Sequence, residues 1–237
     1  MLRSIYNRGV DMHQAPYVHG LFRDVFTGVD TRQKKAIPIG ELHMLLNKDP
    51  QSEKLRRTQA IANLLFQFCG MPFSDLAHLE KSNLERGLLK YNRTKTGTPM
   101  SIEVLESAQN AIGGLYNKSD ARSSGYPDYL FRILSGAYKR NEEGAYREYQ
   151  SALRRFNNEL KSLSRKLRLH SPVTSYTLRH SWATTAKYRG VPIEMISESL
   201  GHKSIKTTQI YLKGFELEER TKVNKLNYSY VCNFKTL

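Results

Sequence analysis

Near the end of the chain, a histidine and a tyrosine lie nine residues apart in a basic, threonine-rich segment. The segment reads SLGHKSIKTTQIYLKG from Ser199 to Gly214, with His202 directly after a glycine and Tyr211 late in a short predicted helix. A tyrosine on a helix is usually a packing residue, but its phenolic oxygen can also act as a nucleophile. The rest of the chain has to decide between these two roles.

Three short helices separated by turns are predicted around this segment, and their junctions would add an arginine to the histidine and the tyrosine. Arg179 lies in the first turns of the first helix, His202 follows the glycine that ends the second, and Tyr211 lies late in the third. Arginine binds two phosphate oxygens at once, and histidine can donate or accept a proton. Together these residue types suit a phosphodiester. The residues predicted to begin the three helices are Thr174, Pro192 and Ser204.

The charge of the chain favours a polyanionic partner. Lysine and arginine number 37 against 22 aspartate and glutamate residues, which gives a net charge of +15 over 237 residues. Because neutralising phosphates releases condensed counterions, such a chain can bind nucleic acid without reading its sequence. The alternative is a merely soluble basic protein. With 39% hydrophobic residues, the chain can bury a core.

The sequence lacks the patterns of several other classes of protein. Cys69 lies in an apolar stretch and Cys232 near the end, so neither a disulfide framework nor a cysteine-based metal cluster is available. The His, Asp and Glu residues show no ligand spacing, and we expect no metal and no cofactor. No apolar run reaches the length of a membrane span. We expect a cytoplasmic protein without a membrane or a small-molecule substrate.

The sequence predicts a mainly α-helical chain with a small β-hairpin, which is an α+β fold. Its opening segment predicts one amphipathic helix followed by a linker, and together they occupy residues 1–34. From residue 35 the pattern is that of a compact domain. One of its helices can be capped by Ser52 and ends at Gly70, and a long amphipathic helix spans about residues 144–169. The basic residues of the long helix are either a solvated face or a DNA contact.

The predicted hairpin carries two basic residues that could take part in chemistry. It is the segment GLLKYNRTKTGTPMSIEV, in which a turn with Thr96 and Gly97 separates two alternating runs. Lys95 lies in this turn, and Arg93 lies two residues before it. Residues two apart on a strand face the same way, so if Lys95 points at a phosphate, Arg93 can too.

The segment TSYTLRHSWATTAKYRGVPIEMISESLGHKSIKTTQIYLK resembles the C-terminal half of the tyrosine recombinase (phage integrase) family. The family pattern is an arginine followed by histidine and an aromatic-Ala stretch, then Leu-Gly-His, then a Thr-Thr-x-x-Tyr segment, and all three parts occur here in order. The resemblance implies a catalytic DNA breaking and rejoining domain over residues 35–220. It also implies the last helix and linker of an N-terminal core-binding domain over residues 1–34. Residues 221–237 form the predicted C-terminal tail, whose sequence ends in an alternating apolar run.

The resemblance also implies a role for each matching residue. Arg179 matches the second family arginine, His202 the histidine after Leu-Gly, and Tyr211 the nucleophile that forms a 3′-phosphotyrosyl bond with DNA. Lys95 matches the hairpin lysine that protonates the departing 5′ oxygen, and its alternative is a solvated turn lysine. A covalent intermediate conserves the bond energy, so the cut strand can be rejoined without ATP.

Two positions depart from the family pattern. An arginine is usual in the segment that here reads GMPFSDLAHL, where Pro72 takes its place, and Tyr176 replaces the histidine usual three residues before Arg179. Tyr176 can donate a hydrogen bond but is a poor base near neutral pH. Arg93 is the predicted substitute for the missing arginine, unless it merely contacts a neighbouring DNA phosphate. Both departures resemble a divergent branch of integrases from conjugative and mobilisable transposons.

The predicted function is cleavage and rejoining of DNA strands in site-specific recombination, by a metal-independent enzyme of a mobile genetic element. Double-stranded DNA is the expected partner, with self-association into a tetramer on it, in a prokaryotic nucleoid. A type IB topoisomerase-like nicking and closing enzyme is the alternative within the same chemistry. A catalytically silent DNA-binding protein is the alternative from another class, and Pro72 favours it. Since most of the N-terminal domain is missing, we expect the chain to be part of a longer protein.

Overall fold

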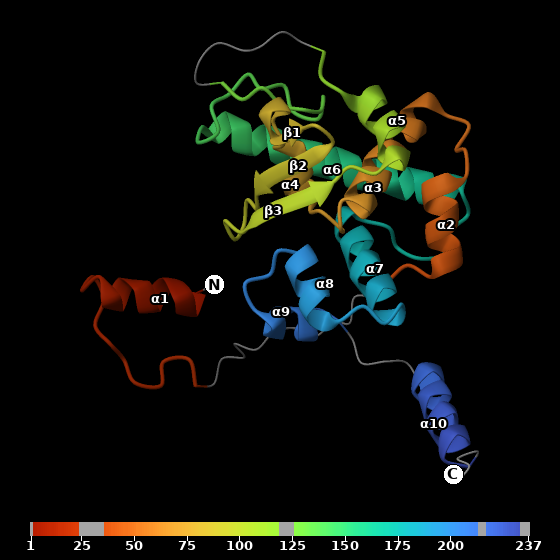
Figure 1. The fold of residues 1–237 in the computed structure, drawn as a ribbon. Helices are drawn as coiled ribbons and strands as arrows, with labels where there is room; N and C mark the ends of the chain where they lie inside the picture. Colours follow the sequence, from red (N-terminus) through yellow and green to blue (C-terminus); the bar gives the residue numbers. More distant parts are fainter. Residues whose placement is uncertain (1, 24–35, 119–125, 213–216, 233–237) are drawn as a thin grey trace. The chain divides into compact units, whose positions relative to one another are not determined.

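A computed structural model gives the fold of the chain (Figure 1). The described residues are mainly helical and include a small antiparallel sheet, which confirms the predicted α+β class. The chain divides into two compact units, Met1–Gln33 and Lys34–Leu237. The residues that the structure describes are 2–23, 36–118, 126–212 and 217–232.

Most of the predicted elements are present, and the structure adds some that the sequence pattern does not predict. The long helix α6 is close to its predicted range, and β2 and β3 form the predicted hairpin. The additions are the helices α2, α4, α5 and α10, the 3-10 helix η1 and the short strand β1. In chain order the elements are α1 (Leu2–Asp11), α2 (Ile39–Asn47), α3 (Glu53–Gln67), α4 (Phe73–Ala77), the 3-10 helix η1 (Lys81–Asn83), β1 (Leu84–Glu85), β2 (Leu88–Asn92), β3 (Pro99–Glu103), α5 (Glu106–Leu115), α6 (Glu143–Lys166), α7 (Ser175–Tyr188), α8 (Ile193–Ser199), α9 (Ile205–Tyr211) and α10 (Leu217–Cys232).

The first unit contains α1 and the turns that follow it. α1 confirms the predicted opening helix, and none of its described residues is buried. The hydroxyl of Tyr6 donates to the carbonyl of Pro16 at 2.7 Å and accepts from the N–H of Val18 at 2.6 Å. These two bonds fold the following turns back onto α1. Most of the predicted linker lies outside the described residues.

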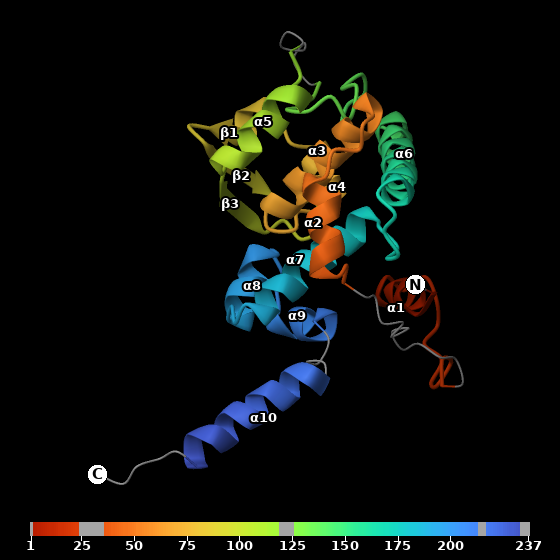
Figure 2. The same ribbon diagram turned by 90° about the vertical axis from the view of Figure 1, so that its right-hand side faces the viewer.

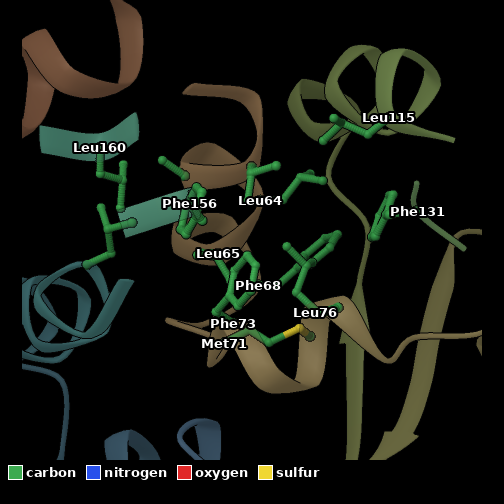
Figure 3. Packing of buried hydrophobic residues seen from close by; sticks show 14 of the residues in the cluster. Leu64, Leu65, Phe68, Met71, Phe73, Leu76, Leu115, Phe131, Phe156 and Leu160 are labelled. Carbon is green, nitrogen blue, oxygen red and sulfur yellow. The ribbon is translucent and has the colours of Figure 1, made fainter. Parts of the chain in front are cut away.

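In the second unit, helices α3 and α4 lie between the sheet and the long helix α6 (Figure 2). Apolar residues recur every three or four positions on α3, so one stripe of the helix is buried, including Leu64 and Leu65. α6 brings Phe156 and Leu160 toward this stripe (Figure 3). Each such buried side chain contributes about 1.5–3 kcal/mol relative to an exposed one. The core therefore fixes α3, whose C-terminal end leads into the turn that forms one wall of the site described below.

The sheet has the strand order β1-β2-β3 and is antiparallel throughout. Leu89 and Ile102 form a cross-strand pair and are both buried, because residues directly opposite each other on neighbouring strands lie on the same face of the sheet. Asn92 and Pro99 form the last pair of the hairpin. Residues 93–98 make the turn between β2 and β3, as the sequence predicts.

The three predicted helices near the C-terminal end are α7, α8 and α9. Thr174 caps α7 as predicted, since its hydroxyl oxygen accepts the N–H of Thr177 at 3.1 Å. Ser52 and Ser204 occupy the N-cap positions of α3 and α9, but neither side chain makes a capping hydrogen bond, so that part of the prediction is wrong. The three helices pack through a second buried cluster, which consists of Ala183, Ile196, Leu200 and Leu212.

The helix α10 covers most of the predicted C-terminal tail. The sequence predicts an alternating apolar run at the end of this tail, whereas Leu217–Cys232 is helical. The alternation is short, and the residues before it include several good helix formers such as Leu, Glu, Arg and Lys, which favour a helix. Among the described residues, no helix is long and apolar enough to cross a membrane.

Candidate active site

The turn between α3 and α4 forms one wall of the site. Gly70 in this turn has φ of +64°, a left-handed conformation that glycine adopts without strain. A Cβ atom on Gly70 would come within 3.1 Å of Cβ of Trp182 and 3.3 Å of the backbone of Arg179. The turn therefore packs directly against α7. Pro72 immediately precedes α4, so this position brings no arginine to the site.

Arg93 and Lys95 lie in the hairpin turn rather than on a strand. Because β2 ends at Asn92, the argument that residues two apart on a strand face the same way is wrong for this pair. Arg93 is 7% exposed, whereas Lys95 is exposed. The two side chains therefore take different directions, with Arg93 turned into the protein.

The guanidinium of Arg93 joins three segments of the chain. Its Nε donates to Oδ2 of Asp75 at 3.3 Å, and its Nη1 donates to the carbonyls of Leu200 at 2.9 Å and Gly201 at 3.3 Å. Asp75 is 2% exposed. A buried charge without hydrogen-bond partners is costly, and the carboxylate and the two carbonyls are the partners of this guanidinium. Arg93 thereby reaches the turn between α8 and α9.

Arg179 reaches the same turn from α7. It is 5% exposed, its Nη1 donates to the carbonyl of Gly70 at 2.8 Å, and its Nη2 donates to the carbonyl of Leu200 at 2.6 Å. The carbonyl of Leu200 thus accepts from both arginines. Asp75 contributes one negative charge against the two positive charges of Arg93 and Arg179, so this part of the site keeps a net positive charge.

His202 lies beside Arg179, and its hydrogen bonds define its tautomer. Its Nε2 is 3.4 Å from Nη2 of Arg179, and its Nδ1 is 2.8 Å from Oγ1 of Thr208. Arginine can only donate, so Nε2 is the acceptor and Nδ1 carries the proton. Burial, followed by the positive charges of Arg179, Arg93 and Lys95, lowers the pKa of His202 to about 4. The imidazole is therefore neutral near pH 7.

Gly201 allows the hairpin turn to pack against the turn between α8 and α9. It has φ of +63°, and a Cβ atom built on it would overlap with Cδ of Arg93 and Sδ of Met100. Its carbonyl also accepts from the hydroxyls of Thr96 at 3.4 Å and Thr98 at 3.3 Å. The glycine of the Leu-Gly-His segment is thus required by close packing as well as by its backbone conformation.

The two remaining predicted site residues, Tyr176 and Tyr211, lie on α7 and α9. Tyr176 lies in the first turn of α7, three residues before Arg179, and is 42% exposed. Tyr211 is the last residue of α9, but its side chain lies outside the described part of the structure. Its distance from His202 and Arg179 stays a prediction.

Two polar residues of the site, Asp75 and Thr208, are not predicted from the sequence. Asp75 is an acidic residue in an apolar stretch, and because a buried acid is nearly always paired, a basic partner could have been sought for it. Thr208 is fully buried while its neighbour Thr207 is exposed. Nothing in a single sequence distinguishes the two threonines.

A second tyrosine, Tyr91 on β2, lies near the arginines. Burial, followed by the negative charge of Asp75, raises its pKa, although the charges of Arg93 and Arg179 oppose the shift. A raised pKa keeps the phenol protonated and makes it a poor nucleophile. Burial therefore favours a packing role for Tyr91 over a role as a nucleophile.

Among the described residues, neither a metal-binding cluster nor the pocket between α3 and α6 forms part of this site. Within the described ranges, no group of three or more His, Cys, Asp or Glu side chains could hold a metal ion. A cavity of about 350 Å³ lies between α3 and α6, and it is formed by other residues than the site. Its charged lining residues are Lys54, Arg57, Arg132, Arg155 and Glu159.

The helices packed around the small antiparallel sheet thus bring two buried arginines and His202 together at one helix junction. The family model described as the phage integrase family matches residues 39–217. This range is most of the chain, so the chain belongs to the phage integrase family. The family membership predicted from the motifs is thus confirmed.

Two curated relatives match most of this chain. Probable integrase/recombinase protein MJ0367 of Methanocaldococcus jannaschii is 28% identical over 204 residues, which are 83% of this chain and 58% of that protein. Tyrosine recombinase XerD of Halalkalibacterium halodurans is 30% identical over 190 residues, which are 76% of this chain and 57% of that protein. The chain therefore spans less than two thirds of the length of these relatives.

Two solved structures share the fold. The crystal structure of XerA recombinase has a TM-score of 0.57 and 22% identity, and the match covers 89% of this chain and 68% of that chain. The structure of the Tn1549 transposon integrase in complex with a circular intermediate DNA has a TM-score of 0.59 and 16% identity. The match covers 94% of this chain and 77% of that chain. At these identities the likeness concerns the fold alone.

Proposed function

We propose that this chain cleaves and rejoins DNA strands in site-specific recombination, as the catalytic part of a tyrosine recombinase. The observation that supports this most is the convergence of Arg93, Arg179 and His202 at the turn between α8 and α9. The three residues come from the hairpin, from α7 and from the turn itself. A partly buried site with surplus positive charge stabilises a phosphate and the charge that develops on it.

In the proposed reaction, the hydroxyl oxygen of Tyr211 attacks a backbone phosphorus of DNA. A bond forms between this oxygen and phosphorus, and the bond from phosphorus to the 5′ oxygen breaks. The tyrosine proton passes to Nε2 of His202, and Lys95 gives a proton to the 5′ oxygen. Arg93 and Arg179 hold the nonbridging oxygens. The reverse steps rejoin the strand.

The hydrogen bonds of His202 support its role as the proton acceptor. Without DNA, Nε2 accepts from Arg179 at 3.4 Å. A phosphate is a stronger acceptor for Arg179 than a neutral imidazole, so bound DNA would release Nε2 for the tyrosine proton. Thr208 keeps the ring oriented through Nδ1. Tyr176, at the position where the family has histidine, is proposed to donate its hydroxyl to a phosphate oxygen.

Double-stranded DNA is the proposed partner. The net charge of +15 supports binding to the phosphate backbone, and the Tn1549 transposon integrase named above is bound to DNA in its structure. Exchange of both strands between two duplexes needs four cleavages, so we propose self-association into a tetramer on DNA. In this proposal residues 1–34 are the last helix of an N-terminal core-binding domain and a linker. Residues 35–220 perform the chemistry with side chains and no metal, and residues 221–237 form a C-terminal tail.

The two alternatives receive less support. The relatives named above are recombinases and integrases, which favours strand exchange over the nicking and closing reaction of a type IB topoisomerase. The catalytically silent alternative depends on Pro72, which leaves the site without the usual arginine. Arg93 supplies a second buried guanidinium beside Arg179, and this favours an enzyme.

A library of nicked duplexes tests the proposed function and selects the DNA site in the same experiment. Random-sequence duplexes carry a nick, so that cleavage close to it releases a short product and traps the protein covalently on DNA. Adducts are isolated under denaturing conditions, and their DNA is sequenced. We expect adducts that share a sequence and that support strand exchange between two intact duplexes. Binding without adducts would favour the silent protein, and adducts without exchange would favour the topoisomerase.

A further inference from the structure

Asp75 holds two consecutive residues at the base of the hairpin turn. Its Oδ2 accepts from Nε of Arg93 at 3.3 Å, and its Oδ1 accepts from the backbone N–H of Thr94 at 3.2 Å. The hydroxyl of Ser74 also donates to Oδ1 at 3.3 Å. The side chain of Asp75 is 1% exposed and that of Arg93 is 7% exposed. This ion pair is therefore shielded from solvent and salt.

The position of this carboxylate links two groups of the proposed reaction. Asp75 lies on α4, three residues after the proline that replaces the usual arginine. The guanidinium of Arg93 is held between this carboxylate and the carbonyls of Leu200 and Gly201, which fixes its plane and leaves Nη2 outside these contacts. The bond to the N–H of Thr94 fixes the direction in which the chain continues to Lys95.

We propose that Asp75 is a positioning residue that sets the phosphate clamp Arg93 and the proton donor Lys95 together. The proposal rests on the proposed function. In this chain the substitute arginine and the lysine share one short turn, and one buried carboxylate anchors that turn to α4. Loss of the anchor displaces both groups, and a displacement of about 1 Å can slow a reaction by roughly a hundredfold. An ordinary structural aspartate would affect stability without this pattern.

Two substitutions of Asp75 separate its two contacts. Asp75→Asn removes the charge that holds Arg93 but keeps an oxygen that can accept the N–H of Thr94. Asp75→Ala removes both contacts. Asp49→Asn is the matched control, because Asp49 also pairs with an arginine, Arg56 at 3.1 Å, but this pair is exposed and lies outside the site.

Single-turnover cleavage at saturating protein is measured on a nicked duplex of the sequence recovered from the adduct library. We expect Asp75→Asn to slow cleavage by about a hundredfold. In the Arg93→Ala background, the same substitution should add less than about threefold, because its effect acts through Arg93. Asp49→Asn should leave the rate unchanged. If the losses from Asp75→Asn and Arg93→Ala multiply, Asp75 does not act through Arg93, and the proposal is overturned.

A sulfur atom in place of the 5′ bridging oxygen tests the link to Lys95. A thiolate leaves without a proton, so it bypasses the general acid. We expect Asp75→Ala to be slower than Asp75→Asn on the oxygen substrate, and the sulfur substrate should reduce this difference to less than about threefold. On the sulfur substrate, both Asp75 variants should still cleave slowly, because the loss of rate that acts through Arg93 does not depend on the general acid. A difference that sulfur leaves unchanged contradicts the positioning of Lys95 by Asp75.

Folding and function are monitored separately. Each variant is checked by circular dichroism and thermal unfolding, and DNA binding is measured in parallel. If Asp75→Asn does not fold, Asp75→Glu replaces it, since the longer side chain keeps the charge but moves the carboxylate. Asp75→Glu should bind DNA normally and cleave at least about tenfold more slowly. A normal rate overturns the proposal, whereas a wild-type protein that forms no adduct contradicts the proposed function instead.

Discussion

Arg93 and Arg179 donate to the same main-chain oxygen, that of Leu200, at 2.9 Å and 2.6 Å. The two guanidiniums come from the hairpin turn and from α7, so the shared acceptor makes neighbours of residues that are distant in sequence. Burial, followed by the charges of these two arginines, lowers the pKa of His202 and keeps its ring neutral. This pair of arginines is the basis for assigning a phosphate to the site and for the predictions that follow.

Arg93→Ala should slow cleavage by about a hundredfold or more at saturating protein, because a clamp on the transition-state charge is lost. Arg93→Lys should recover only part of the rate, since lysine cannot reproduce the forked hydrogen bonds of a guanidinium. Single-turnover kinetics measure both variants. A near-normal rate for Arg93→Ala, with weaker DNA binding, would mean that Arg93 only contacts a neighbouring phosphate.

Gly201→Ala should reduce both stability and cleavage. The backbone at residue 201 is in a left-handed conformation, which is strained for alanine. The new Cβ would also overlap with Arg93, so the substitution displaces the hairpin turn. Gly190→Ala is the matched control, because Gly190 has φ of +78° with open space around its Cβ position. Each substitution should lower the free energy of unfolding by about 1 kcal/mol or more, as measured by thermal unfolding. Only Gly201→Ala should also slow cleavage. Equal cleavage rates for the two variants would show that the packing against Arg93 is unimportant.

Thr208→Val should slow cleavage by about tenfold or more while the fold is kept. The substitution leaves Nδ1 of His202 without its partner, a loss of about 1–3 kcal/mol, and the ring is no longer held in one orientation. Thr207→Val is the control, because Thr207 is exposed and one residue away. The two variants are compared in the same adduct assay. Equal rates would remove Thr208 from the site.

His202 should titrate with a pKa of about 4 in the free protein, which is below its ordinary value of 6.5. Between about pH 6.5 and pH 4, His202 is protonated in the unfolded chain but not in the folded chain. Its contribution to stability therefore falls as the pH drops through this range. His202→Gln should lack this part of the pH dependence. NMR titration of the imidazole measures the pKa directly, and a bound DNA phosphate should raise it. A pKa near 6.5 in the free protein would contradict the arrangement of the three cations.

The parts of the site that the sequence predicts are those with strong local signals. The hairpin around Lys95 follows from two alternating runs and a glycine-containing turn. The helix that carries Arg179 follows from the cap at Thr174. The five-residue helix α4 has no such signal, because it is too short to show a helical period.

The position of Arg93 depends on contacts that no local pattern reveals. Its partners Asp75 and Leu200 are 18 and 107 residues away in the sequence. Arg93 is predicted from the sequence as the substitute arginine, but through an alternation that applies only to strands. What brings the side chain to Arg179 is a turn held by a buried carboxylate and by two backbone carbonyls. A single sequence does not contain this tertiary pairing.

The central claim is that Tyr211 is the nucleophile, and the covalent adduct on a nicked duplex tests it most directly. Tyr211→Phe deletes only the attacking oxygen, so it should bind DNA almost as the wild type does and form no adduct after denaturing electrophoresis. Tyr91→Phe is the control, since Tyr91 lies near the arginines with a raised pKa and has no part in the proposed chemistry. Its adduct should persist. An adduct that remains in Tyr211→Phe, or one that disappears in Tyr91→Phe alone, would contradict the account.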